Sequence, residues 1–280
     1  MSNQVHRDLT ASGARLRVVE QGEGDPILLL HGMFMDHSTW SGVMHRLEND
    51  FRLIAPDLPG FGESEKPPPR RFSYGVEALA GTIADLFGAL RLGRAAVVGH
   101  DLGGAVALTL GVRHPELVSR LVLVSSLCHE APRSIAHRIA GFPLVGNLFF
   151  KQFLGRPSFR AILGEQLVAS GTPNRLQRID AYYDKFNLPS ARGSALATIN
   201  ATADTRPLVA QLDRLQARTL VVWGRRDPIY PAQLGQRLAR EVRGAGFELL
   251  DSGHTPQEEQ PDELARVIRR FLKAERPSSW

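Results

Sequence analysis

The side chain in this sequence with the clearest chemical potential is the carboxylate of Asp101, which lies in the run G-H-D-L-G at residues 99–103. Small and β-branched residues precede the run at 95–98, and an apolar helical pattern follows it at 105–112. This is the spacing of a nucleophile elbow, a turn that leads from a strand directly into a helix. Its glycines let strand and helix approach closely while the middle residue is held in strained backbone geometry. The spacing therefore predicts that Asp101 stands exposed beside the positive N-terminus of a helix.

An aspartate at this position favours one kind of reaction. A carboxylate that attacks an ester would have to form an anhydride and expel an alkoxide, which is energetically uphill. A carboxylate that attacks saturated carbon instead forms an alkyl ester, which stores the substrate as a covalent intermediate. The pattern therefore indicates a substrate with a leaving group on saturated carbon, such as an epoxide or a carbon–halogen bond.

Two further residues complete a site of this kind. Asp227 follows the strand-like run T-L-V-V-W at 219–223, and His254 follows the strand-like run at 247–250. Side chains just past the carboxyl ends of parallel strands lie on the side of the sheet where such folds carry their chemistry. We therefore expect Asp227 to orient His254, and His254 to activate a water molecule.

The elements that must position these residues alternate along the chain. Strand-like runs lie at 14–20, 26–30, 51–55, 95–98, 121–124, 219–223 and 247–250. Runs with helical period lie at 76–90, 105–112, 232–242 and 261–272. Strands and helices that alternate with short connections indicate a parallel sheet covered by helices on both faces. For His31 and Asp57, which follow the second and third strands, we expect structural hydrogen-bonding roles.

Residues 128–206 interrupt this alternation, because the segment contains no strand-like run and is rich in hydrophobic residues. We interpret the segment as an inserted helical cap, whose apolar residues can pack on the core or line a pocket. The predicted domains are therefore a core at 1–127 and 207–280 and a cap at 128–206. Tyr182 and Tyr183 are the only tyrosines of the cap segment.

Composition limits the partners of this protein. The net charge of +5 over 280 residues comes from dispersed arginines, which indicates a solvated surface and no nucleic-acid partner. The single cysteine, Cys128, excludes an internal disulfide framework and a cysteine-based zinc site. The N-terminus has no apolar segment typical of a secretory signal, and no run of about 18 apolar residues is present to span a membrane. We therefore expect a cytoplasmic protein without a membrane partner, either a monomer or a homodimer.

Five stretches of the sequence together resemble the α/β-hydrolase family over nearly the whole chain. They are H-G-M-F at 31–34, P-D-L-P-G-F-G-E-S at 56–64, V-G-H-D-L-G-G at 98–104, W-G-R-R-D-P at 223–228 and S-G-H at 252–254. The resemblance implies the α/β-hydrolase fold, in which helices flank a mostly parallel central sheet and a helical cap is inserted. It also implies a catalytic triad in the order nucleophile, acid and histidine, here Asp101, Asp227 and His254.

The same resemblance implies an oxyanion hole made by the backbone N–H groups of Met33 and Leu102, and neither a cofactor nor a metal. With Asp101 at the elbow, the chain resembles the branch that contains epoxide hydrolases, haloalkane dehalogenases and haloacetate dehalogenases. Haloalkane dehalogenases usually carry Trp after the nucleophile, where this sequence has Leu102. Epoxide hydrolases usually protonate the epoxide oxygen with two cap tyrosines, for which Tyr182 and Tyr183 are the candidates. Adjacent helical residues point in different directions, so we expect one of the two to face the pocket.

Four functions remain open at this point. The leading one is cofactor-independent hydrolysis of an epoxide in a hydrophobic small molecule, through a covalent ester of Asp101 and with water as the second reactant. The second is hydrolysis of a carbon–halogen bond. The third is an ester or carbon–carbon bond hydrolase scaffold in which Asp101 replaces a serine, and the fourth is a non-catalytic ligand-binding protein. The pair Asp227 and His254 favours an enzyme, because a binding protein does not need it.

Overall fold

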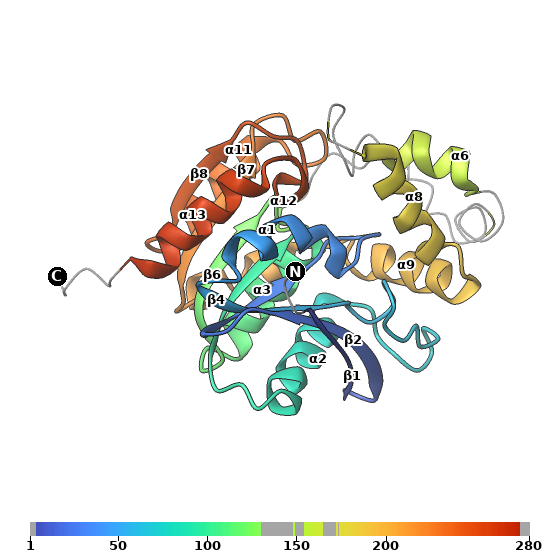
Figure 1. The fold of residues 1–280 in the computed structure, drawn as a ribbon, viewed down its shortest axis with the longest axis horizontal. Coiled ribbons are helices and arrows are strands. Elements are labelled where there is room, and N and C mark those ends of the chain that lie inside the picture. The colour runs from blue at the N-terminus through green and yellow to red at the C-terminus, as the bar shows by residue number, and fades with distance from the viewer. Residues whose placement is uncertain (1–3, 130–147, 149–153, 165–171, 173, 275–280) are drawn as a thin grey trace.

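An eight-stranded sheet with strand order β1-β2-β4-β3-β5-β6-β7-β8 lies at the centre of the molecule (Figure 1). The computed structural model describes residues 4–129, 148, 154–164, 172 and 174–274. The strands are β1 Val5–Ala11, β2 Ala14–Gln21, β3 Asp25–Leu30, β4 Phe51–Pro56, β5 Ala95–His100, β6 Val118–Val124, β7 Arg218–Gly224 and β8 Gly246–Leu250. β2 runs antiparallel to both of its neighbours, and every pairing from β4 to β8 is parallel. The predicted α/β fold with a mostly parallel sheet is confirmed.

The edge strand β1 is the one described strand that the sequence pattern does not predict. It pairs with β2 in a register that sets Val5 opposite Glu20 and Ala11 opposite Ala14. Every residue of β1 before Ala11 is exposed or half-buried. An edge strand with so little buried surface needs no hydrophobic alternation, and its sequence therefore carries no strand signal.

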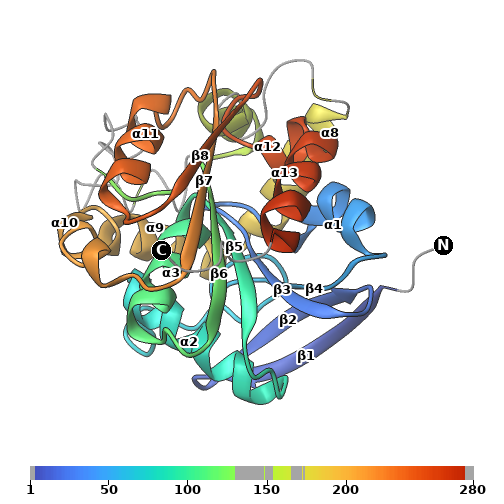
Figure 2. The ribbon, with the colours of Figure 1, turned by 90° about the vertical axis from the view of Figure 1, so that its left-hand side faces the viewer.

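Helices cover both faces of the sheet (Figure 2). α1 and α13 lie on one face, and α2, α3 and α11 lie on the other. Their bounds are α1 Ser41–Leu47, α2 Val76–Ala89, α3 Leu102–Arg113, α11 Ala232–Glu241 and α13 Pro261–Lys273. Shorter turns of helix are η1 His37–Trp40, α10 Arg206–Val209, η4 Leu212–Arg214 and α12 Pro256–Glu259. No helix among the described residues is long and apolar enough to cross a membrane.

The central strand β3 shows how the two faces are filled. Its side chains alternate between the faces, as strand geometry requires. Ile27 and Leu29 belong to the hydrophobic core on the side of α1 and α13, whereas Leu28 and Leu30 belong to the core on the side of α2 and α3. A near-continuous apolar run is therefore needed in a strand that is buried on both faces.

In the predicted cap segment, the described residues form the helices α6 Arg156–Phe159, α8 Arg175–Phe186 and α9 Pro189–Ala201 and the π-helical turn η3 Arg160–Gly164. These elements lie together on one side of the sheet in Figure 1. The described part of 128–206 contains no strand, as expected. Residues 130–147, 149–153, 165–171 and 173 lie outside the described residues, and the boundaries of the cap stay a prediction.

The buried carboxylate of Glu258, in α12, anchors helix α8 to the core. Its Oε1 accepts a hydrogen bond from Thr39 Oγ1 at 2.7 Å and another from the Tyr182 hydroxyl. Its Oε2 pairs with the guanidinium of Arg178 at 3.0 Å. Burial raises the pKa of Glu258, although these three partners oppose the rise. The Glu258 carboxylate is buried, whereas the Arg178 side chain is 39% exposed, so the buried hydrogen bond from Tyr182 is the part of this anchor that is shielded from water.

Cys128 lies at the start of the predicted cap and is 1% exposed. Burial, together with the nearby carboxylate of Glu241, raises the pKa of its thiol to about 12. Because the thiolate is the reactive form of cysteine, this buried thiol is chemically inert at neutral pH.

The predicted site residues gather at the carboxyl ends of parallel strands. Met33 follows β3, Asp101 follows β5 directly, Asp227 follows β7, and His254 follows β8. Since these strands run in the same direction, the four loops leave the same edge of the sheet.

Candidate active site

Asp101 occupies a strained turn between β5 and α3. Its φ of 49° and ψ of −116° lie in a region that residues other than glycine rarely adopt. A Cβ atom on Gly99 would lie 2.3 Å from the carbonyl oxygen of Gly103, and one on Gly103 would lie 2.4 Å from that of Leu30. The close approach of strand and helix therefore requires both glycines, as the elbow pattern predicts.

The two carboxylate oxygens of Asp101 have different partners. Oδ2 accepts a hydrogen bond from the backbone N–H of Met33 at 2.8 Å. Oδ1 accepts a hydrogen bond from the hydroxyl of Tyr230 at 2.9 Å. Leu102 is the first residue of α3, so its N–H belongs to the amides at the helix N-terminus that have no intrahelical carbonyl. The Met33 amide therefore contacts Asp101 directly, and the role of the Met33 and Leu102 amides as an oxyanion hole stays a prediction.

His254 and Asp227 are in direct contact, as predicted. Nδ1 of His254 lies 3.0 Å from Oδ2 of Asp227, and both side chains are buried. The other oxygen of Asp227 accepts the backbone N–H groups of Ile229 and Tyr230 at 2.9 Å each, an Asx-type turn that fixes the carboxylate.

The charges of this pair support each other. Burial alone would lower the pKa of His254, but the charge and hydrogen bond of Asp227 raise it above its ordinary value. Burial alone would raise the pKa of Asp227, but the charge of His254 and the backbone amides lower it. Asp227 therefore stays ionised at neutral pH and holds the proton of His254 on Nδ1.

Tyr230 is a site residue that the sequence analysis does not identify. Its hydroxyl donates to Asp101, and its backbone N–H donates to Asp227. Its ring packs edge-on against the imidazole of His254, with centroids 5.3 Å apart. Its carbonyl accepts the indole N–H of Trp223 at 2.8 Å. One residue therefore contacts all three predicted triad members, and its place three positions after Asp227 is the signal that could have revealed it.

His100, the last residue of β5, supports the loop that carries His254. Its Nε2 donates to the backbone carbonyl of His254 at 2.9 Å, and the centroids of the two imidazole rings lie 4.7 Å apart. Burial, with the nearby His254, lowers the pKa of His100 to about 3. The His100 ring is therefore neutral, and it positions the loop without adding charge to the site.

The hydroxyl groups of the two cap tyrosines have other partners. Tyr182 donates to Glu258, and Tyr183 donates to Oδ1 of Asn187 at 3.0 Å. Both tyrosines are buried. In the part of the chain that the structure describes, no hydrogen bond joins either hydroxyl to Asp101. Their role as proton donors to an epoxide stays a prediction.

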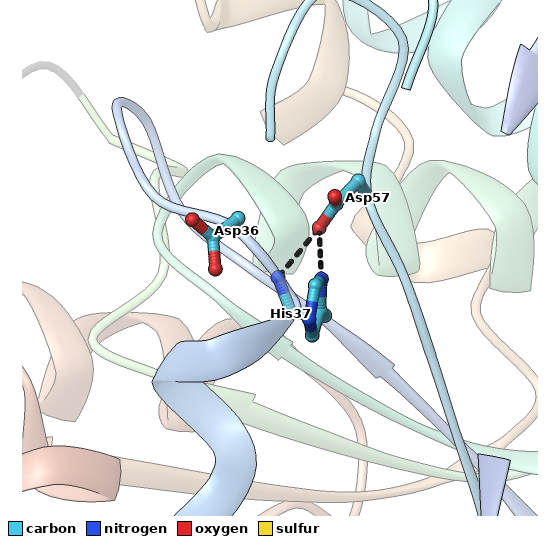
Figure 3. Close-up of side chains that lie close together, drawn as sticks. All are labelled: Asp36, His37 and Asp57. Atoms are coloured by element: carbon cyan, nitrogen blue, oxygen red, sulfur yellow. Dashed lines mark hydrogen bonds and ion pairs between the residues drawn. The ribbon is translucent and has the colours of Figure 1, made fainter. Parts of the chain in front are cut away.

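Asp57 has the structural role expected from its position before the elbow (Figure 3). Its Oδ1 accepts the backbone N–H of His37 at 2.7 Å and the Nδ1–H of the same residue at 2.8 Å. Its Oδ2 accepts the backbone N–H of Glu63 at 2.7 Å. His31 is likewise structural, because its Nε2 accepts the backbone N–H of Leu58 at 2.9 Å.

Asp36, His37 and Asp57 also have a spacing that would suit a metal ion. However, Nδ1 of His37 already binds Asp57, and the ammonium group of Lys185 pairs with Asp36 at 3.0 Å. A cation between them would compete with both contacts. We therefore assign the cluster to the packing of α8 and of the loops after β3 and β4.

An aromatic cluster packs the cap helices over the loop that carries Met33. The ring centroid of Phe34 lies 6.1 Å from that of Phe159 in α6 and 5.6 Å from that of Phe186 in α8. Phe159 also contacts Tyr183, with centroids 5.4 Å apart. The cap helices therefore pack their aromatic side chains on Phe34, the neighbour of Met33, and the rings of this cluster are buried.

A separate cavity of about 330 Å³ adjoins the elbow helix. It lies between α2 and α3 on one side and the segment from α9 to α10 on the other, and Ala105 and Leu127 contribute to its lining. Leu127 also donates its backbone N–H to the carbonyl of Asp101 at 3.1 Å. Among the described residues that line the cavity there is no triad residue, so it neighbours the site rather than forming it.

The fold and a comparison with known families define a class of protein. A family model for the alpha/beta hydrolase fold matches residues 25–261. The chain therefore belongs to the α/β-hydrolase family and is a hydrolase, as the five sequence motifs imply.

The relatives of this chain include more than one kind of hydrolase. The 2-hydroxymuconate semialdehyde hydrolase of Pseudomonas putida is 31% identical, over 97% of this chain and 95% of its own length. Epoxide hydrolase 3 of Xenopus tropicalis is 28% identical, over 94% of this chain and 76% of its own length. In structure, the chain is similar to 2-hydroxy-6-oxo-6-phenylhexa-2,4-dienoate hydrolase from a Rhodococcus strain, with a TM-score of 0.84 over 98% of this chain and 100% of that one. That pair is 23% identical, so the likeness concerns the fold.

Proposed function

We propose that this protein hydrolyses an epoxide in a hydrophobic small molecule through a covalent ester of Asp101, with water as the second reactant and no cofactor. The observation that carries the proposal is the placement of a carboxylate at the elbow, with Oδ2 bound by the Met33 amide and Oδ1 by the Tyr230 hydroxyl. The similarity to an epoxide hydrolase supports it. The buried aromatic rings of Phe34 and Phe159, next to Met33, make this side of the site apolar, which supports a hydrophobic substrate.

The first half-reaction is attack by Asp101 on a saturated carbon of the epoxide. Oδ1 forms a bond to that carbon, and the carbon–oxygen bond of the epoxide breaks, so the epoxide oxygen takes up the electron pair and then a proton. The nucleophile is a carboxylate, which carries its own negative charge, so this step needs no base. Ring strain makes the epoxide oxygen an effective leaving group, which an ordinary ether oxygen is not.

The second half-reaction is hydrolysis of the ester by water. His254, held by Asp227, removes a proton from a water molecule that attacks Cγ of Asp101. Negative charge then develops on Oδ2, where the amides of Met33 and Leu102 would stabilise it. Breaking of the bond between Cγ and Oδ1 releases the diol and regenerates the enzyme.

The two half-reactions have different requirements, and the experiment uses this difference. The variant His254→Gln should be alkylated by styrene oxide or bromohexane and should then fail to hydrolyse the ester. Intact-protein mass spectrometry should find one added alkyl unit, located by peptide mapping on the peptide that contains Asp101. The control His254→Gln/Asp101→Asn lacks the nucleophile and should gain no mass. A serine enzyme does not separate in this way, because its nucleophile needs the histidine in the first step as well.

A second candidate function is hydrolysis of an ester or a carbon–carbon bond, which the 31% identity to a 2-hydroxymuconate semialdehyde hydrolase favours. Cleavage of simple esters by the wild type, with no adduct of His254→Gln from any epoxide or halide, would replace the epoxide proposal by this one. Release of halide faster than formation of diol would instead indicate a dehalogenase.

A further inference from the structure

We propose that Tyr230 is a further catalytic residue, whose hydroxyl protonates the alcohol oxygen that leaves Asp101 when the covalent ester is hydrolysed. The inference rests on the proposed function, since it concerns the second half-reaction of that mechanism. It assigns an acid to a residue of the core domain, in the loop after β7, rather than to the cap.

The Tyr230 hydroxyl forms a hydrogen bond with only one of the two carboxylate oxygens of Asp101. It donates to Oδ1 at 2.9 Å, whereas Oδ2 is bound by the Met33 amide at 2.8 Å. The oxygen in the oxyanion hole becomes the carbonyl oxygen of the ester, so Oδ1 is the oxygen that attacks the substrate. A carboxylate oxygen has two lone-pair positions, and the bond from Tyr230 leaves one of them free for this attack.

The same oxygen is the leaving atom of the second half-reaction. In the ester, Oδ1 joins Cγ of Asp101 to the substrate carbon. When water attacks Cγ, the bond between Cγ and Oδ1 breaks, and the electron pair goes to Oδ1. The leaving group is therefore an alkoxide that needs a proton at the position where the Tyr230 hydroxyl already lies.

Tyr230 is held firmly in this position. Its backbone N–H and carbonyl bind Asp227 and Trp223, and its ring packs against His254. Burial, with the charge of Asp101, raises the pKa of Tyr230 well above its ordinary value, so the phenol carries its proton in the free enzyme, and esterification of Asp101 removes the charge that contributes to this rise. In the described part of the chain, no hydrogen bond joins His254 to Asp101. The Tyr230 hydroxyl is therefore the side-chain donor that contacts Oδ1 among the described residues.

The proton transfers balance through His254. The imidazole takes one proton from the attacking water, and Tyr230 gives its own proton to Oδ1 as the alcohol leaves. The imidazolium then returns a proton to the Tyr230 phenolate, which restores both side chains. The second proton of the water remains on the new Asp101 carboxyl group and is released when that group ionises.

This role predicts opposite requirements in the two half-reactions. Alkylation of Asp101 uses Oδ1 as a nucleophile, and a hydrogen bond to a nucleophile does not assist its attack. Ester hydrolysis develops charge on Oδ1, and a proton donor there lowers the barrier by the amount typical of general acid catalysis. A residue that only positioned Asp101 would assist both steps, and a merely structural residue would affect neither.

The test compares Tyr230→Phe with Tyr74→Phe. Tyr74 is equally buried, and its hydroxyl also forms hydrogen bonds, but to the carbonyl of Pro67 and to Ser194. With styrene oxide and with bromohexane, rapid quenching and mass spectrometry give the rates of adduct formation and of adduct loss separately. We expect Tyr230→Phe to form the adduct at the wild-type rate or faster and to lose it about 10²-fold more slowly, so that the adduct accumulates. Tyr74→Phe should show wild-type rates in both steps.

Each other outcome overturns the inference in a recognisable way. Adduct loss from Tyr230→Phe at the wild-type rate would remove Tyr230 from the reaction while leaving the proposed function intact. Slowing of both steps to the same extent would make Tyr230 a positioning residue. An absence of adduct even in His254→Gln would overturn the proposed function, and this inference with it. Thermal melting compared with Tyr74→Phe controls for a folding defect, because Phe keeps the ring and both backbone hydrogen bonds.

Discussion

Nδ1 of His254 lies 3.0 Å from Oδ2 of Asp227, and the two side chains are buried together at the carboxyl ends of the neighbouring strands β7 and β8. The backbone amides of Ile229 and Tyr230 hold the other oxygen of Asp227. The orientation of the imidazole therefore follows from a local turn of the β7 loop, and it can be tested by mutation.

Replacement of Asp227 by asparagine should slow ester hydrolysis by about 10²-fold or more, because His254 loses the partner that orients it and stabilises its charge. Alkylation of Asp101 should be retained, since the carboxylate needs no base. The matched control is Asp251→Asn, which removes an exposed carboxylate paired with Arg226 on the surface. Both rates are measured by rapid quenching, and full activity of Asp227→Asn would refute the assignment of the acid.

The pH dependence of the two steps should differ. Ester hydrolysis needs neutral His254, so its rate should rise with pH through the pKa of this residue, whereas alkylation should not follow that titration. The pKa of free His254 is raised by Asp227 and also by the charge of Asp101. Esterification removes the Asp101 charge, so the kinetic midpoint of ester hydrolysis should lie below the His254 pKa measured by NMR in the free enzyme. A midpoint at or above that pKa would contradict the geometry.

The predicted role of the cap tyrosines can be separated from their packing. If Tyr182 or Tyr183 protonates the epoxide oxygen, its change to Phe should slow alkylation by styrene oxide about 10²-fold. Alkylation by bromohexane should be unaffected, because a halide ion leaves without a proton. The halide thus serves as an internal control for Tyr182→Phe, which also loses the contact with Glu258. Equal slowing with both reagents would indicate a structural role alone.

The glycine at the start of the elbow should be intolerant of a side chain. Gly99→Ala places a Cβ atom 2.3 Å from the carbonyl oxygen of Gly103, and we expect a loss of about 1–3 kcal/mol or more in the free energy of unfolding. Gly81→Ala, in α2, meets no atom within 4 Å and should gain about 0.5–1 kcal/mol through helix propensity. Urea unfolding measures both, and equal stabilities would contradict the close approach.

Among the described strands, the sequence predicted those that contain an apolar run and missed β1, which contains none. Strands such as β5 and β7 carry continuous apolar runs because helices cover both faces of the sheet. β1 lies at the edge with six of its seven residues exposed or half-buried, so no apolar pattern marks it. Buried strands can be predicted from one sequence because their side chains must be apolar. An exposed edge strand such as β1 forms by pairing with its neighbour, which requires no apolar pattern.

The site residues that directly follow a strand could be predicted, whereas Tyr230, which a loop places in the site, could not. Asp101, Asp227 and His254 each stand just beyond a strand end, so the direction of the sheet brings them to one edge. The Asp227 carboxylate accepts the backbone N–H of Tyr230, and this turn of the loop places the Tyr230 hydroxyl on Asp101. The contact depends on the geometry of this loop, for which the position of Tyr230 three residues after Asp227 is the only sign in the sequence.

The burial of Cys128 has a practical consequence for covalent labelling. Epoxides and alkyl halides are also common thiol reagents, and an accessible cysteine would compete with Asp101 for them. The only thiol of the chain is 1% exposed, and its pKa is raised to about 12. A gain in mass on the folded protein therefore has no thiol background. A cysteine introduced at an exposed position of α8, such as Leu176, would for the same reason accept a fluorophore at a single site.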